Sequence, residues 1–355
     1  MTDVERASGP ALPTEPARPP AMSDVALLAG VSHQTVSRVL NNHASVRPAT
    51  RARVLEAIAA LGYRPNSAAR TLVTRRSRTF GVITPATTLY GPTGTLVGLE
   101  QAARDVEHMV LVAMLRRIDA STVHEAVEHL LSQGVDGLVM VTPTTEAIGV
   151  LAAVPASLPV VVVSSGDLGR SAGHLYQVAV DQRGGARAAT EHLLAGGRRE
   201  VLHVAGPQDW FDARDRLDGW QDACRAAGKG ADLLVQKGWS AQEGLQVGRL
   251  LIERGLPEAV FAANDQLALG LLQALWAAGV RVPDDVAVVG FDDEAGAEFY
   301  TPALSTVRQD LSALGRRAVD VLLAALAGEE PPEGLIPAEL VVRASSRPAL
   351  QAVGL

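Results

Sequence analysis

The stretch that decides the fold of the N-terminal part lies at residues 22–42 and reads MSDVALLAGVSHQTVSRVLNN. It predicts two short helices joined by a turn. Ser23 is placed to cap the first helix, and Gly30 supplies the left-handed conformation that ends it. Ser32 is placed to cap the second helix. A hairpin of this kind is typical of helix-turn-helix domains that bind DNA.

The outward side of the second predicted helix is rich in hydrogen-bonding side chains. Val36, Val39 and Leu40 recur at helical spacing and therefore face inward, which leaves polar residues on the other side. Such residues can bind base edges and phosphates in the major groove, whereas the alternative is an ordinary solvated face. We expect the DNA contacts of this region to come from Ser23, His33, Gln34, Thr35, Ser37, Arg38, Asn41 and Ser45.

The charge of the chain is unevenly distributed along its length. The whole sequence of 355 residues carries a formal net charge of −7. Residues 21–78 nevertheless carry +7, because nine arginines face only Asp24 and Glu56, and residues 79–355 carry −13. A basic N-terminal part suits binding to DNA phosphates, and an acidic remainder disfavours docking in the wrong orientation.

The segments on either side of the hairpin complete a small domain. Pro48 can open a third helix whose inward side includes Val54 and Ile58. We therefore expect an all-α helix-turn-helix headpiece over residues 21–64. Residues 1–20 contain five prolines and few large apolar groups, so we expect a disordered tail there.

Residues 22–42 resemble the headpiece of the LacI/GalR family of transcriptional regulators, which shares the motifs D-V-A, A-G-V-S and T-V-S-R-V. In that family the next segment is a hinge that becomes helical on the operator and inserts a leucine into the minor groove. The resemblance implies such a hinge over residues 65–78, although the residues alone fit an ordinary linker equally well. The hinge contacts that it implies are Asn66, Ala69 and Leu72.

The rest of the chain alternates between strand-like and helix-like runs, which is typical of parallel sheets covered by helices on both faces. Eight strands are more than we expect in a single doubly wound sheet. We therefore expect two doubly wound α/β lobes over residues 79–348 and a short tail at 349–355. The resemblance implies a periplasmic-binding-protein-like domain whose chain crosses between the lobes three times. The expected strands are 80–84, 109–115, 135–141, 159–164, 176–181, 200–205, 259–263 and 286–291. The expected helices are 95–107, 121–133, 184–195, 213–227, 241–254, 265–278 and 310–327.

Polar residues directly follow most of the predicted strands. In open parallel sheets, ligands bind beyond the carboxyl ends of the strands, so a cleft between the lobes would gather these residues around a small hydrophilic molecule. Each of them could instead be only a helix cap. The pairs concerned are Thr84-Pro85, Thr142-Pro143, Ser164-Ser165, Gly206-Pro207, Asn264-Asp265 and Asp292-Asp293.

Two further segments indicate a sugar as the ligand. Arg216 lies near the start of a predicted helix and Trp239 lies in a loop, and an aromatic ring beside Arg, Asn and Asp side chains suits a pyranose. Trp239 as a plain core residue is the alternative. The motifs A-R-x-R-L-x-G-W, W-S-A, A-N-D-Q-x-A-L-G and V-V-G-F-D-D extend the family resemblance into this half. It implies effector contacts at Leu89, Pro92, Arg216, Trp239, Asn264, Asp292 and Gln309.

Two positions of the expected effector site depart from the family pattern. Val141 stands where a sugar-binding member of the family has an asparagine, and Ser164 stands where that member has an aspartate. Ser164 remains in the expected site, but fewer partners for sugar hydroxyls remain. The departures weaken the inference to a galactoside.

The sequence lacks the motifs that are typical of an enzyme, a metalloprotein or a membrane protein. The eight histidines are scattered and no phosphate-binding Gly-Lys-Ser/Thr loop occurs, so we expect no catalysis, no metal and no cofactor. Cys224 is the single cysteine, which excludes an internal disulfide. No apolar stretch reaches the ~20 residues of a membrane span. The N-terminus lacks a hydrophobic signal core, and we expect a cytoplasmic protein without a membrane partner.

We expect a homodimer, because helix-turn-helix proteins generally place two recognition helices on a palindromic operator. The interface is expected within residues 81–115, with Leu96, Val97 and Leu99, and the absence of leucine heptads argues against a coiled-coil tetramer. The sequence thus predicts a transcriptional repressor that a sugar or glycoside, bound between the lobes, releases from operator DNA. The alternative is a corepressor, such as a purine, that tightens DNA binding.

Overall fold

The structure of the chain is a computed structural model that separates into two units, Met1–Arg75 and Arg76–Leu355. The predicted contacts Asn41, Asn66, Ala69 and Leu72 lie outside the described residues, as do Thr142 and Pro143. The described residues are 18, 20–40, 43–64, 76–141, 145–152, 154–166, 173–230 and 232–347.

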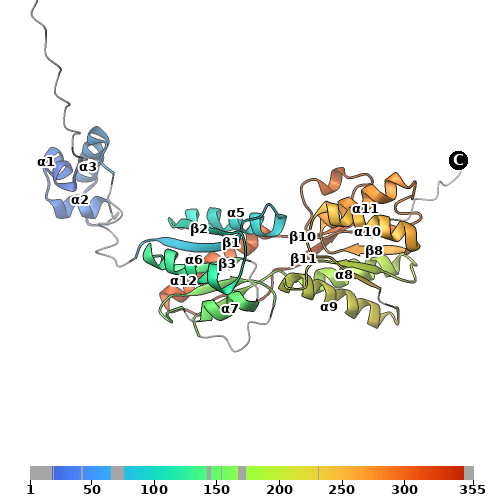
Figure 1. Ribbon diagram of the computed structural model, residues 1–355. Helices are drawn as coiled ribbons and strands as arrows, with labels where there is room; N and C mark the ends of the chain where they lie inside the picture. The colour runs from blue at the N-terminus through green and yellow to red at the C-terminus, as the bar shows by residue number, and fades with distance from the viewer. Residues whose placement is uncertain are drawn as a thin grey trace, which may run out of the picture. The chain divides into compact units, whose positions relative to one another are not determined.

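The first unit contains three short helices around a small apolar core (Figure 1). Its core includes Val25, Val36 and Val54, one from each helix, together with Tyr63 from the segment that follows. This arrangement confirms the inward faces that were expected from the helical spacing. The helices are α1 (Met22–Ala29), α2 (His33–Leu40) and α3 (Pro48–Leu61).

The caps of the two hairpin helices differ from each other in how well the sequence predicts them. Ser32 caps α2 as expected, because its hydroxyl accepts the Thr35 N–H at 3.2 Å. The expectation that Ser23 caps α1 is wrong, since α1 begins at Met22 and its N-cap is Ala21. The Asp24 carboxylate accepts the Ala21 N–H at 2.8 Å and satisfies this helix end instead.

The second unit begins with a lobe built on a five-stranded parallel sheet in the order β2-β1-β3-β4-β5. Its inner strands read as continuous apolar runs, as in GLVMV of β3, because both faces are covered. The strands are β1 (Thr79–Pro85), β2 (Met109–Leu115), β3 (Gly137–Val141), β4 (Val160–Val163) and β5 (Leu175–Val178). Two helices cover each face: α5 (Tyr90–Asp105) and α12 (Leu311–Ala327) on one, α6 (Ala120–Ser132) and α7 (Thr145–Ala152) on the other.

The other lobe repeats this plan on a four-stranded parallel sheet in the order β7-β6-β8-β9. Trp220 and Phe261 fill its core on one side, and Val260 and Leu271 fill it on the other. The strands are β6 (Leu202–Ala205), β7 (Leu233–Val235), β8 (Ala259–Ala262) and β9 (Ala287–Val289). The helices are α8 (Gln182–Ala195) and α9 (Phe211–Ala226) on one face, α10 (Ala241–Arg254) and α11 (Asp265–Ala277) on the other.

The chain passes three times between the two lobes, as the family resemblance implied. It leaves the first lobe after β5 and enters α8, returns through β10 (Thr306–Gln309) to α12, and leaves again through β11 (Ala338–Val341). β10 and β11 pair antiparallel between the lobes (Figure 1). A bridge from Val180 to Ile336 ties the first crossing to the third.

All eight expected strands of the two lobes are present, whereas three strands and one helix were missed. β7 has only three residues and is largely exposed, and β10 and β11, which form the connection between the lobes, read TVRQ and AELV and so lack the long apolar runs of strands such as β1, β3 and β4. The unexpected helix is α7. Cys224 is buried in the core of the second lobe.

Candidate DNA-binding face and effector pocket

The polar face expected on α2 is open to solvent. His33, Gln34 and Arg38 are exposed, while Thr35 and Ser37 are partly exposed. The Thr35 hydroxyl hydrogen-bonds the Ser32 hydroxyl at 2.9 Å, which fixes its position at the start of the helix. The face therefore presents guanidinium, amide and imidazole groups of the kind that bind base edges and phosphates.

The loop after α2 is held in place by an arginine that sequence reasoning missed. Arg51, on α3, donates from Nη2 to the His43 carbonyl at 3.0 Å and from Nη1 to the Val39 carbonyl at 3.4 Å. Within the loop, Ser45 is exposed and its hydroxyl lies 2.8 Å from His43 Nδ1. The arginine thus couples the third helix to the end of the expected recognition helix.

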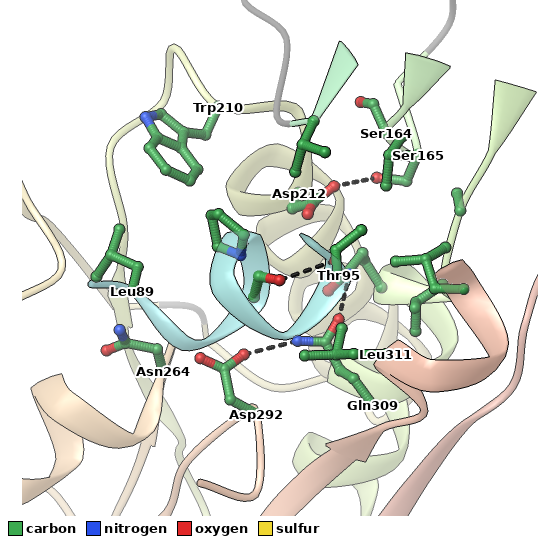
Figure 2. A pocket seen from close by; sticks show the side chains of 18 of the residues that line it. Leu89, Thr95, Ser164, Ser165, Trp210, Asp212, Asn264, Asp292, Gln309 and Leu311 are labelled. Atoms are coloured by element: carbon green, nitrogen blue, oxygen red, sulfur yellow. Dashed lines mark hydrogen bonds between the residues drawn. The ribbon is translucent and has the colours of Figure 1, made fainter. Parts of the chain in front are cut away.

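A pocket with about 610 Å³ of empty space, which includes space open to solvent, lies between the lobes of the second unit (Figure 2). All eight residues of the expected effector site line it, so the structure brings together segments from both lobes and from the crossings. The lining residues are Leu89, Gly91, Pro92, Thr95, Val141, Val163, Ser164, Ser165, Ala179, Val180, Gln182, Trp210, Asp212, Arg216, Trp239, Asn264, Asp292, Gln309, Leu311 and Leu314.

Arg216 is the centre of a buried polar network in this pocket. It lies in the second turn of α9, is only 5 % exposed, and its guanidinium carbon lies 3.8 Å from the centre of the Phe291 ring. It donates from Nε to Gln182 Oε1 at 2.9 Å, from Nη1 to the Ala263 carbonyl, and from Nη2 to Asp292 Oδ1 at 3.3 Å. All three of its nitrogens therefore already have protein partners.

Two glutamines extend this network to the strands that cross between the lobes. Gln309 donates from Nε2 to Asp292 Oδ1 at 2.7 Å, and Gln182 donates from Nε2 to Gln309 Oε1 at 2.7 Å. Gln309 ends β10 and Gln182 begins α8, so the network joins the first and second crossings. A ligand that displaces any member would act on both crossings.

Asp292 combines a strained backbone with a buried, poorly solvated carboxyl group. Its φ of 115° lies in the left-handed region that non-glycine residues rarely adopt. Burial raises the pKa of Asp292 to about 7, although the Arg216 charge opposes the rise. Burial also raises the pKa of Asp265 well above its usual value, helped by the Asp292 charge.

Trp239 and Asn264 support each other at the base of the pocket. Asn264 donates from Nδ2 to the Trp239 carbonyl at 3.1 Å and accepts the Leu267 N–H at 2.8 Å, so it both caps α11 and lines the pocket. Trp239 is 8 % exposed, and its indole N–H is buried without a hydrogen-bond partner among the described residues. Gly206 is required beside it, because an added Cβ would lie 2.3 Å from the indole.

The wall from the first lobe is mainly apolar, with Leu89, Pro92 and Val163 among its residues. Thr95 lies within this wall, but its hydroxyl is already bonded to the Gly91 carbonyl at 2.8 Å. At one end of the wall, Ser165 donates to Asp212 Oδ1 of the other lobe at 3.0 Å (Figure 2). This hydrogen bond connects the lobes directly across the pocket.

Not every residue that follows a strand reaches the pocket. Asp265 lies behind it, where it accepts from the Thr306 hydroxyl and the Glu294 N–H. Asp293 is instead paired with Arg308 and Arg343, each at 2.7 Å. Besides Ser165, which was expected only as a residue that follows a strand, the expected site missed four polar or aromatic lining residues: Thr95, Gln182, Trp210 and Asp212.

Helix starts were the signal that could have revealed the missed residues. Gln182 and Asp212 lie in the first turns of α8 and α9, close to strand ends but not directly after them.

The described part of the chain contains no cluster of His, Cys, Asp and Glu able to hold a metal ion, and none of its helices is long and apolar enough to span a membrane.

Comparison with known proteins supports the two-part organisation. A model of bacterial regulatory proteins of the lacI family matches residues 21–66, and a periplasmic binding protein-like domain model matches residues 190–346. The lactose operon repressor of Escherichia coli K12 is 34% identical over 331 residues, which cover 92% of this chain and 90% of the repressor. The chain belongs to the LacI family.

Solved structures of family members show the same fold as this regulator. A lac repressor dimer bound to operator and the anti-inducer ONPF matches with a TM-score of 0.83 and 33% identity, covering 93% of this chain and 99% of that one. A complex of the regulator CelR with cellobiose matches with a TM-score of 0.68 and 31% identity, covering 92% and 99%. The protein is thus a DNA-binding transcriptional repressor of the LacI family and not an enzyme.

Proposed function

We propose that this LacI-family repressor is released from its operator by a small neutral sugar or glycoside bound between the two lobes. The observation that carries the proposal is the Arg216–Asp292–Gln309–Gln182 network, which lines the pocket and includes two of the crossings. A ligand that changes this network would bias the arrangement of the lobes. Such a bias can reach the DNA only through differential affinity for the two arrangements.

The chemistry of the pocket favours a neutral, hydroxyl-rich ligand. Asn264, Asp292 and Gln309 provide amide and carboxylate groups for hydroxyls, while Trp239 and the aliphatic wall provide contacts for sugar C–H faces. The charge of Arg216 is already paired with Asp292, two further protein acceptors bind the same guanidinium, and Asp212 would repel an anion. A relative whose structure contains cellobiose supports the same class of ligand.

The DNA side of the proposal rests on α2 and on the predicted hinge. We propose base or phosphate contacts from His33, Gln34 and Arg38, which are exposed on α2, with further contacts from Thr35 and Ser37. Minor-groove contacts from Asn66, Ala69 and Leu72 remain a prediction. A palindromic operator would follow from a dimeric repressor.

We further propose a homodimer, which the structure of a related repressor dimer supports, and we place its interface on the first lobe. β2 is an edge strand of the sheet, and its Met109 and Met114 are 71% and 56% exposed. Val97 on the neighbouring α5 is also exposed, and Leu96 is partly so. Leu99 cannot contribute as expected, because it is fully buried inside the lobe.

The test of the proposal measures operator binding and sugar binding separately. Arg38→Ala should abolish retention of operator DNA in a gel shift while leaving sugar binding in calorimetry unchanged, because Arg38 lies in the first unit and the pocket in the second. A thermal-shift screen of neutral sugars and nucleobases identifies the ligand. Normal operator retention by Arg38→Ala would contradict the DNA assignment.

The second candidate function is a corepressor-type regulator with a purine as ligand. One observation favours it: Trp210 and Trp239 both line the pocket with ring centres 5.5 Å apart, and a flat base can also stack on indole. Under this function the ligand strengthens operator binding in the gel shift. Under the proposed function it weakens that binding.

A further inference from the structure

We propose that helix α12 transmits a change in the pocket to the chain segment that leads to the headpiece. Arg76 is the positioning residue that ties this segment to the helix. The inference rests on the proposed function, because it names the route by which a ligand between the lobes acts on operator binding. α12 begins at Leu311 and ends at Ala327, so Leu311 and Leu326 lie about 22 Å apart along its axis. One end of the helix lies at the pocket, and the other lies at the start of the second unit.

The first turn of α12 belongs to the pocket (Figure 2). Leu311 and Leu314 line the pocket, and Gln309, a member of the buried polar network, lies two residues before the helix. Asp310, the N-cap residue, accepts the Ala313 N–H at 2.7 Å. A ligand that displaces Gln309 or fills the space beside Leu311 therefore acts directly on this helix end.

The first half of α12 crosses α5 with the two backbones in close contact. A Cβ added to Gly98 of α5 would lie 2.7 Å from the Leu311 carbonyl oxygen, and a Cβ added to Gly315 of α12 would overlap the backbone of Gly98. Close-packed groups of this kind leave no void into which either helix can shift. A displacement of the first turn therefore cannot be absorbed at the crossing and moves α12 along its length.

The last turn of α12 is bonded to the start of the second unit. The final carbonyls of a helix have no partner within it, and Arg76 donates from Nη2 to the Leu326 carbonyl at 2.8 Å. The helix dipole also favours a cation at this end. Arg76 belongs to residues 65–78, which the sequence predicts as the hinge, so the far end of α12 holds the described end of that segment.

The next two residues are fixed to the sheet and not to the helix. The Asp136 carboxylate accepts the Ser77 N–H at 2.9 Å and the Arg78 N–H at 2.7 Å. Asp136 directly precedes β3, and its own N–H donates to the Thr79 carbonyl at 2.8 Å. Arg76 thus lies between a point fixed to the sheet and a point fixed to α12. A shift of α12 relative to the sheet changes the direction in which the chain leaves the lobe.

Arg78 provides the matched comparison for Arg76. Both arginines are exposed and carry the same charge, but the Arg78 guanidinium pairs with Glu107 at 2.6 Å, in the connection between α5 and β2. If Arg76 acts only as a cation near DNA phosphates, its removal and that of Arg78 have the same effect. If it acts through α12, only its removal disconnects operator binding from the pocket.

A double-mutant cycle on the full-length protein tests this route without a ligand in the pocket. The probe is a fluorescent DNA duplex that the wild-type protein selects from a random-sequence pool, and anisotropy gives its dissociation constant. Gly98→Ala, which pushes the first turn of α12 away from α5, should change this constant at least fivefold. In the Arg76→Ala background it should change the constant less than twofold, whereas in the Arg78→Ala background the fivefold change should remain.

Further variants separate positioning from a loss of structure. Arg76→Lys, which keeps a donor and a charge, should restore at least a threefold response to Gly98→Ala. Gly149→Ala, on α7 where an added Cβ meets nothing within 4 Å, should leave the constant within twofold. Circular dichroism checks that each variant folds. If Gly98→Ala does not fold, Gly94→Ala takes its place, because the Cβ there meets only the flexible Leu311 side chain.

The outcomes also separate this inference from the proposed function. Distant substitutions without a shared contact are additive within about twofold. Equal responses to Gly98→Ala with and without Arg76, or a wild-type response smaller than fivefold, would therefore overturn the inference. Loss of the response in the Arg78→Ala background would overturn it as well. A failed sugar screen leaves the cycle unaffected, and a failed cycle leaves a sugar ligand in place.

Discussion

The two walls of the pocket differ in how their polar groups are held. In the second lobe, the charged Arg216 and Asp292 and the amide of Asn264 are buried. Each of them is held by hydrogen bonds to other protein groups. In the first lobe the wall is aliphatic, and its hydroxyl groups on Ser164 and Ser165 lie near one end. Under the proposed function, we infer from this difference that the second lobe determines which ligand binds, while the first lobe determines how binding changes the lobe arrangement.

The largest expected effect comes from removing the centre of the polar wall. Arg216→Ala removes the counter-ion of the buried Asp292 and leaves the acceptors on Gln182 and Ala263 without their donor, which we expect to cost about 3–5 kcal/mol of stability. Sugar binding in calorimetry should disappear, whereas operator binding at low temperature should persist. A variant that binds sugar within threefold of the wild type would show that the second lobe does not determine ligand binding.

The pH dependence of stability tests the same wall through Asp292. Its pKa is raised from 3.8 to about 7, so the folded state binds this proton more tightly than the unfolded state does. The associated stabilisation is full below about pH 4 and is lost as the pH rises to 7, by about 4 kcal/mol. Asp292→Asn should flatten this part of the curve of unfolding free energy against pH. An unchanged slope in the variant would contradict the assigned pKa.

A smaller effect is expected where Trp239 is supported. Gly206→Ala would place a methyl group against the indole and push it into the pocket, at a cost of about 1–3 kcal/mol in stability. Sugar affinity should fall with it, because the displaced ring fills ligand space. Pro207→Ala serves as a neighbouring control outside the pocket lining. Equal thermal stability and equal sugar affinity in Gly206→Ala and wild type would show that the contact is unimportant.

The smallest effect is expected at the wall of the first lobe. Ser165→Ala removes the hydrogen bond to Asp212, worth about 0.5–1.5 kcal/mol, but leaves the polar wall of the second lobe intact. If that bond stabilises one lobe arrangement, the affinities for sugar and for operator should shift severalfold in opposite directions. Shifts in the same direction, or none in either, would remove the first lobe from the coupling.

The sequence predicted the fold and the exposed polar face of α2 well because both depend on local signals. The glycine turn, the Ser32 cap and the spacing of Val36 and Val39 suffice for α2, and apolar runs mark eight of the strands. The error at Ser23 arose because Asp24, one residue later, satisfies the helix end instead. β10 and β11 were missed because they connect the lobes and read TVRQ and AELV, without a continuous apolar run.

The candidate pocket could be predicted only in part. The residues that the family motifs suggested all line it, and reading the positions after strands found Ser164, Asn264 and Asp292. That rule could not reveal Gln182 or Asp212, whose places depend on how α8 and α9 begin and on how the two lobes face each other. The hydrogen bond between Ser165 and Asp212 joins residues 47 positions apart and has no local signal.

The central claim is that the pocket and the operator-binding unit are thermodynamically coupled, and fluorescence anisotropy of labelled operator DNA tests it most directly. The affinity of the full-length dimer for the operator is measured with and without the sugar that binds most tightly in calorimetry, and the affinity for that sugar is measured with and without the operator. We predict that each ligand weakens the other by the same factor, about 10–100-fold. Sugar binding that leaves operator affinity unchanged, or increases it, would contradict the account.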